Sequence, residues 1–152
     1  MDSASFPNLT GDAVDGTPFS APADFAHGRT IVLTAFALES RAEVETWGPY
    51  LDALVRARSD VRARLLAVLG SGAKMMRGMI LGGLRTALAA PELRASTIVV
   101  FTDVDAFCRA LGVDDRKHLA AFLVEADGRI SWRGSGAYTP AAGASLNEAL
   151  GV

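Results

Sequence analysis

The chain has 152 residues, of which half are hydrophobic and about a fifth are charged, as is typical of one globular domain. Its net charge of −2 excludes the strongly basic balance of proteins that bind nucleic acid or anionic membranes through their charge. Cys108 is the one cysteine, so no intrachain disulfide can form. We expect no signal peptide, because the first residues lack a basic segment and a long apolar core, and no apolar run is long enough to span a bilayer. A cytoplasmic protein follows as the expectation.

Residues 1–28 are rich in Pro, Gly, Asp and Ser and predict a lead-in with short extended pieces, including a hairpin that turns near Asp15-Gly16. The apolar run Thr30–Leu38 then predicts a strand covered on both faces. Behind it, the apolar residues have the spacing of one buried helix stripe. They are Val44, Trp47, Leu51, Leu54 and Val55. Pro49 lies inside this pattern and should kink or interrupt the helix.

The joint between that strand and helix reads Ser40-Arg41-Ala42-Glu43, which matches a capping box. In this motif Ser40 accepts a hydrogen bond from a free amide of the first turn, and Glu43 reaches back to the cap. Free amides and the helix dipole stabilise anions at such a position, so α/β proteins often keep chemistry there.

A second strand, Val61–Leu69, is followed by a helix from about Ala73 to Ala90 that Pro91 should end. Its methionines gather on one side, whereas Arg77 points away from them. They are Met75, Met76 and Met79. Two interpretations stay open: the methionines fill the core, or they form an adaptable surface for another protein, with Arg77 and Arg85 at its rim.

The third strand is Thr97–Thr102, and Asp103 should cap the short helix behind it. Cys108 shares the apolar stripe of that helix with Phe107 and Leu111, which predicts a buried thiol. Gly112 should end the helix.

The last part of the chain predicts a hairpin of strands Leu119–Glu125 and Arg129–Arg133, then a helix from about Pro140 to Leu150. Strict alternation would place Trp132 with Ile130 on the core side and leave Arg133 free to bind or to pair with an acid. Strand and helix units that alternate before a terminal hairpin predict one α/β domain over residues 1–152, with a central mixed sheet and helices on both faces.

Four stretches carry a resemblance to a known superfamily. They are Ala35–Glu43, Val100–Asp103, Leu111–Val113 and Phe122–Ile130. Together with the order of elements they resemble the thioredoxin-like superfamily in its peroxiredoxin-like arrangement, which implies a three-layer sandwich. The resemblance places Ser40 and Glu43 at the two positions of the family's Cys-x-x-Cys motif. The family's cis-proline should stand near Leu119–Ala120, where this chain has no proline.

A narrower resemblance covers the C-terminal third and one helix. Its residues are Phe122–Val124, Gly128–Ala137 and Trp47–Pro49. They look like the ATP synthase assembly factor Atp10 and its bacterial relatives, which are thioredoxin-like without being thiol oxidoreductases. The resemblance implies an assembly factor that acts on another protein.

Thiol chemistry in this fold needs a thiolate at the helix N-terminus, and Ser40 with Glu43 cannot supply one. We therefore expect a redox-inactive binding or assembly factor with a degenerate site at Ser40, Arg41 and Glu43, and without a cofactor or metal. The expected partner surface contains Met75, Met76, Met79, Arg77 and Arg133, and a homo-oligomer stays open. The alternative is a peroxiredoxin-like or thiol-dependent oxidoreductase that uses Cys108 or residues other than cysteine.

Overall fold

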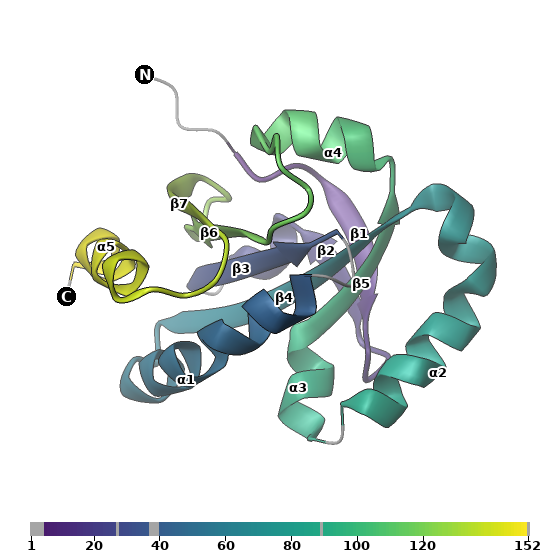
Figure 1. Cartoon of the computed structure of the whole chain (residues 1–152), viewed down its shortest axis with the longest axis horizontal. Helices are drawn as coiled ribbons and strands as arrows, with labels where there is room; N and C mark the ends of the chain where they lie inside the picture. Colours follow the sequence, from purple (N-terminus) through teal and green to yellow (C-terminus); the bar gives the residue numbers. More distant parts are fainter. Residues whose placement is uncertain (1–4, 27, 37–39, 89, 152) are drawn as a thin grey trace.

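The strands form one mixed sheet (Figure 1). The computed structural model describes residues 5–26, 28–36, 40–88 and 90–151. Within them the sheet has seven strands in the order β2-β1-β5-β4-β3-β6-β7. The strands are β1 (Leu9–Ala13), β2 (Pro18–Ala21), β3 (Arg29–Ala35), β4 (Val61–Gly70), β5 (Thr97–Thr102), β6 (Ala120–Val124) and β7 (Ile130–Ser135). The expected α/β architecture is confirmed. β3 ends at Ala35, short of the predicted end at Leu38, and residues 37 and 38 of that prediction lie outside the described residues.

Parallel strands make the centre of the sheet and antiparallel hairpins make its two edges. β4 pairs in parallel with β3, Leu33 opposite Leu65, and with β5, Leu66 opposite Ile98. The expected C-terminal hairpin extends the sheet beside β3, and the β1–β2 hairpin extends it beside β5. Such central strands are buried on both sides, as β3 is from Thr30 to Thr34.

Helices cover both faces of this sheet. The α-helices are α1 (Arg41–Ala57), α2 (Arg77–Ala87), α3 (Pro91–Ser96), α4 (Val104–Leu111) and α5 (Pro140–Leu150), and the 3-10 turns include η1 (Ala23–Phe25) and η3 (Ser71–Met76). No helix among the described residues is sufficiently long and apolar to span a bilayer.

Side chains that alternate along β3 divide the core in two. Ile31 and Leu33 pack with Trp47 of α1 and with α5, whereas Val32 packs on the other face with Phe107 of α4 and with η1. A third cluster joins Leu81 of α2 to Val14 and Val99. The sheet is therefore packed on both faces, with α1 and α5 on one face and α4 on the other.

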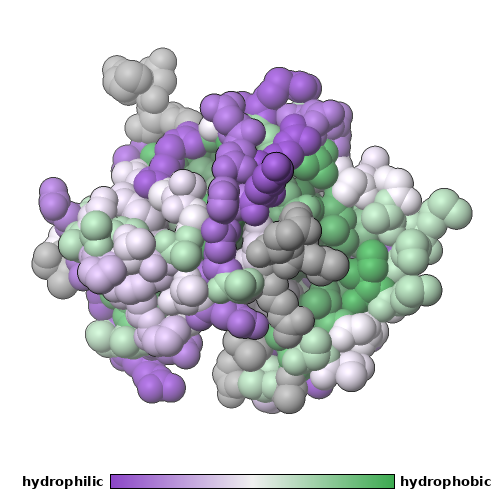
Figure 2. Space-filling view, viewed as in Figure 1, coloured by the Kyte–Doolittle hydropathy of each residue, from purple (hydrophilic) through white to green (hydrophobic). Residues whose placement is uncertain are grey.

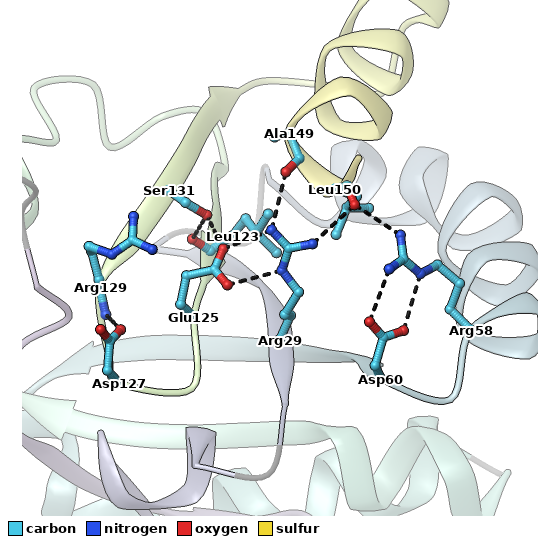
Figure 3. Close-up of polar contacts among 10 residues, drawn as sticks. All are labelled: Arg29, Arg58, Asp60, Leu123, Glu125, Asp127, Arg129, Ser131, Ala149 and Leu150. Atoms are coloured by element: carbon cyan, nitrogen blue, oxygen red, sulfur yellow. Dashed lines mark hydrogen bonds and ion pairs between the residues drawn. The ribbon is translucent and has the colours of Figure 1, made fainter. Parts of the chain in front are cut away.

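Two arginines fasten the C-terminus of α5 to the sheet (Figure 3). Arg29 of β3 forms an ion pair with Glu125, with both N···O distances 3.0 Å, and donates to the carbonyls of Ala149 and Leu150. Arg58 also donates to the Leu150 carbonyl. Positive groups are favourable at a helix C-terminus, where carbonyls are left without partners.

Several expectations about helices need correction. α1 runs through Pro49 as one helix, so the expected interruption there is wrong. A proline removes only one internal hydrogen bond, and the packing of Trp47 and Leu51 on either side of it holds the two halves together. The single helix expected between about Ala73 and Ala90 is the turn η3 followed by the shorter α2. Pro91 begins α3 instead of only ending a helix, since its fixed φ suits a first helical turn.

The expectation for β7 is also wrong in part. The pairing of β6 with β7 shifts between Leu123 and Val124, so that Leu123 faces Trp132 and Val124 faces Ile130. This bulge inserts one extra residue and reverses the alternation. Ile130 therefore packs on the α4 face and Trp132 on the α1 face.

Candidate functional site

The start of α1 faces the loop that leads into β6. The helix begins at Arg41, as the joint predicted, and Ser40 immediately before it is fully buried. The hydroxyl of Ser40 donates to the Lys117 carbonyl at 3.2 Å. These contacts join two segments 77 residues apart and place Ser40 inside the fold.

The prediction of a capping box at this joint is wrong. Ser40 has helical backbone angles, φ −74° and ψ −10°, and its side chain makes no cap hydrogen bond. An N-cap residue needs extended angles to aim its oxygen at the first-turn amides. Asp103 has them and caps α4 as expected, by accepting from the Ala106 amide.

Glu43 does not reach back to Ser40 but across to the β6 loop. One carboxylate oxygen accepts from the Leu119 amide at 2.9 Å, and the other lies 2.7 Å from Nδ1 of His118. Because Leu119 is fully buried, its amide depends on this carboxylate as its acceptor. The glutamate therefore stabilises the chain direction immediately before β6.

His118 completes a short line of polar groups, Glu43–His118–Asp115. Its Nε2 lies 3.7 Å from a carboxylate oxygen of Asp115. The hydrogen bond to Glu43, followed by the negative charges of Glu43 and Asp115, raises the pKa of His118 above its ordinary value. The imidazole side chain is 55% exposed and that of Glu43 only 18%. A half-exposed histidine can hold a proton here, but no thiol accompanies it.

Sequence reasoning placed no base near Ser40 and missed His118, since 75 residues separate it from Glu43. The signal available in the sequence was the resemblance, which puts the counterpart of the family's cis-proline near Leu119–Ala120, directly after His118. The prediction for the side chain of Arg41 lies outside the described residues. No group of three or more His, Cys, Asp and Glu in the described parts of the chain could hold a metal ion.

Cys108 lies apart from this cluster, inside the packing of α4. Its side chain is buried with only 1% of the residue exposed, which confirms the expected place on the apolar stripe. Burial raises the pKa of the Cys108 thiol, and the nearby charge of Arg116 opposes that shift without cancelling it. A buried thiol with a raised pKa is the opposite of a reactive one.

Four of the five residues expected to form one partner surface follow each other closely on η3 and α2, whereas Arg133 lies on β7. Met75, Met76 and Met79 are exposed on η3 and α2. Arg77 is paired with Asp12 of β1. Arg133 lies over the Phe122 ring, 5.5 Å from its centroid, and donates to the Leu111 carbonyl. Arg133 therefore holds α4 against β7 and is not free to pair with an acid as expected.

Comparison with known proteins gives structural matches alone. No family model and no curated protein sequence matches the chain. A thioredoxin-family thiol:disulfide interchange protein from Chlorobium tepidum TLS superposes with a TM-score of 0.60 at 17% identity, covering 99% of this chain and 96% of its own. Yeast Sco1 with copper bound gives 0.66 at 13% identity, covering 99% and 94%.

A third match is BsSco, a member of the Sco family of cytochrome c oxidase assembly proteins. Its TM-score is 0.64 at 10% identity, and 99% of this chain and 95% of that chain are covered. At these identities the likeness establishes the fold. The chain has an α/β thioredoxin-like fold.

Proposed function

We propose that this chain is a redox-inactive thioredoxin-like domain that binds another protein as an interaction or assembly factor. The observation that carries the proposal is the outward methionine surface, defined here as Met75, Met76 and Met79. Their exposed fractions are 95%, 50% and 71%. The core interpretation of these residues is wrong, and the interpretation as a surface for a partner is the one we develop.

The methionine surface stands on a firmly attached element. Leu81 on the inner side of α2 is 6% exposed and packs against Val14 and Val99. Arg77 pairs with Asp12, and Arg85 donates to the Val14 carbonyl. α2 therefore buries its own apolar side without the three methionines.

Figure 2 shows this side of the molecule as largely hydrophobic to weakly polar where α2 lies in Figure 1, at the right-hand edge. Burial of one methionine side chain is worth roughly 1.5–3 kcal/mol, and this gain is not realised in the isolated chain. Flexible thioether side chains adapt to varied partner shapes. A partner with an apolar helix or groove would recover that energy.

Two further features support a role without thiol chemistry. Ser40 and Glu43 occupy the positions where the resemblance places the family's cysteines, and both are committed to contacts within the chain. The Atp10-like stretches and the likeness to BsSco, an assembly-protein family member, favour an assembly factor. The single cysteine also suits a reducing compartment, and we propose a cytoplasmic location on that ground.

The test compares the wild-type chain with a variant carrying Met75→Ser, Met76→Ser and Met79→Ser. Each tagged chain is incubated with native cell extract, and the retained proteins are identified and then titrated against both chains. We expect one retained protein to bind the wild-type chain and to lose at least about tenfold in affinity with the variant, because a single buried methionine accounts for that much.

Two controls separate binding from folding. The triple variant should keep its unfolding free energy within about 0.5 kcal/mol, as exposed positions do. Val55→Ser removes another partly exposed apolar side chain, 38% exposed on α1, and should leave partner binding unchanged. Unfolding of the triple variant, or equal retention of every protein by both chains, would contradict the proposal.

A further inference from the structure

A cavity opens beside the first residues of β4, on the sheet face that carries Phe19. Its volume is about 350 Å³, and its lining includes Arg62, Arg64, Asp15, Thr17, Phe19 and Asp24. β5 pairs with β4 only from Leu65 onward, so the strand edge at Arg62 and Arg64 lacks that neighbour. The two arginines are two residues apart on one strand and so point to the same face.

The arginines of this cavity lack the carboxylate partners that other arginines of the chain have. Arg29, Arg58 and Arg77 each form an ion pair with Glu125, Asp60 and Asp12 respectively. Arg64 is partly buried, and the hydrogen bond that it makes is to the carbonyl of its own neighbour, Ala63, at 2.9 Å. Within the described residues no ion pair joins Arg62 or Arg64 to an acidic group.

The acidic residues of the cavity hydrogen-bond backbone amides and form no ion pair with the two arginines. Asp15 accepts from the Thr17 amide at 3.0 Å, and Asp24 accepts from the Ser20 amide at 2.6 Å. The charge of Asp24 still favours the charged form of Arg64, but burial and the like charge of Arg62 outweigh it and lower the pKa of Arg64. A partly buried guanidinium such as Arg64 is costly without an ion pair, and the exposed Arg62 beside it adds repulsion.

We infer that this cavity binds a small anionic molecule whose carboxylate or phosphate group lies between Arg62 and Arg64. Planar guanidinium groups match these oxoanions through paired hydrogen bonds. Phe19, Pro18 and Ile98 line the same cavity and offer apolar contacts to the rest of the ligand. The volume is at the lower end for small-molecule sites, and the carboxylates of Asp15 and Asp24 disfavour a polyanion.

The test uses three probes of defined chemistry: inorganic phosphate, phenyl phosphate and benzoate. Binding is followed by the amide chemical shifts of Thr17 and Ala95, which both line the cavity, with chloride added to equal ionic strength as the blank. We expect saturable shifts with a dissociation constant of about 1 mM or below for at least one aromatic probe. Tighter binding of phenyl phosphate indicates a phosphate ligand, and tighter binding of benzoate indicates a carboxylate.

Substitutions of the two arginines test whether they bind the anionic probes. Arg62→Gln and Arg64→Gln should each weaken that binding by about tenfold, the usual worth of a charged hydrogen bond. Arg64→Lys keeps the charge and covers the case in which Arg64→Gln fails to fold; it should weaken binding less than Gln does. Arg109→Gln, on the exposed side of α4, removes an equal charge elsewhere and should change nothing. Absence of saturable shifts with all three probes, or equal binding by the wild type and the arginine variants, overturns the inference.

Discussion

Replacing Glu43 with alanine should destabilise the protein, although the residue stands near the surface at a helix start. The variant removes the acceptor of the Leu119 amide, which lies 2.9 Å from the carboxylate in a fully buried residue. A buried donor left without an acceptor costs about 1–3 kcal/mol. For a chain of this size each kcal/mol lowers the unfolding midpoint by roughly 2–4 °C, so we expect a fall of about 5 °C.

Urea and thermal unfolding measure this loss, and two variants test its cause. Glu43→Gln keeps an oxygen that can accept from Leu119 and should lose less than half as much stability as Glu43→Ala. Glu148→Ala removes an exposed glutamate of α5 and should stay within about 0.5 kcal/mol of the wild type. An equally small change for Glu43→Ala would refute the reasoning.

The pKa of His118 gives a second measurement on the wild type and on Glu43→Gln. Its pKa is raised mainly by the hydrogen bond to Glu43, so an NMR titration should place it above the ordinary 6.5 in the wild type and lower in Glu43→Gln. Since the folded-state pKa is raised, the stabilisation from this contact is complete below pH 6.5 and is lost as the pH rises through the folded-state pKa. An unchanged His118 pKa in Glu43→Gln would show that the contact with Glu43 does not stabilise the protonated imidazole.

Further predictions concern the sheet end and two glycines. Burial alone would raise the pKa of Glu125, but hydrogen bonds from Arg29 and Ser131 and nearby positive charges lower it below 4.5. The contribution of Glu125 to the stability of the fold is therefore present above pH 4.5 and is lost as the pH falls through the folded-state pKa. Arg29→Met should cost about 2 kcal/mol at pH 7 and flatten the acid limb in urea unfolding at several pH values. Gly83→Ala in α2 places its Cβ in open space, with nothing within 4 Å, and should add about 0.5–1 kcal/mol of stability. Gly11→Ala would place its Cβ 2.6 Å from the Val99 carbonyl oxygen and should destabilise by about 1–3 kcal/mol in the same assay.

Local patterns predicted the elements whose signals are contained in a few neighbouring residues. The apolar run at Val61 became β4, the Asp103 cap begins α4, and α5 has the bounds expected from Pro140 to Leu150. The Asp15-Gly16 turn also joins β1 to β2. In each case propensity, capping and burial favour the same structure, so a few neighbouring residues are enough to predict the element.

Long-range contacts decided the features that sequence reasoning missed. Ser40 and Glu43 have the spacing of a capping box, but Lys117 and Leu119 offered them partners from the β6 loop. A bulge of one residue moved Trp132 to the face opposite Ile130, and strand periodicity does not reveal such a shift.

The methionine surface is a further feature that sequence periodicity did not predict. Met75, Met76 and Met79 have helical spacing that suits a core, yet Leu81 and Leu84 supply the inner side of α2. Which apolar side of a glycine-containing helix is buried depends on how the preceding turn η3 leaves β4. That geometry is set by tertiary packing rather than by periodicity.

The central claim is that this thioredoxin-like domain works without thiol chemistry, and insulin reduction with a thiol titration of Cys108 tests it most directly. With dithiothreitol as reductant, the wild-type chain should reduce insulin no faster than the reductant alone. Cys108 should react with a thiol reagent only after unfolding in guanidinium, because it is fully enclosed in the native fold. Catalytic turnover by the native chain that disappears in Cys108→Ser would contradict the account.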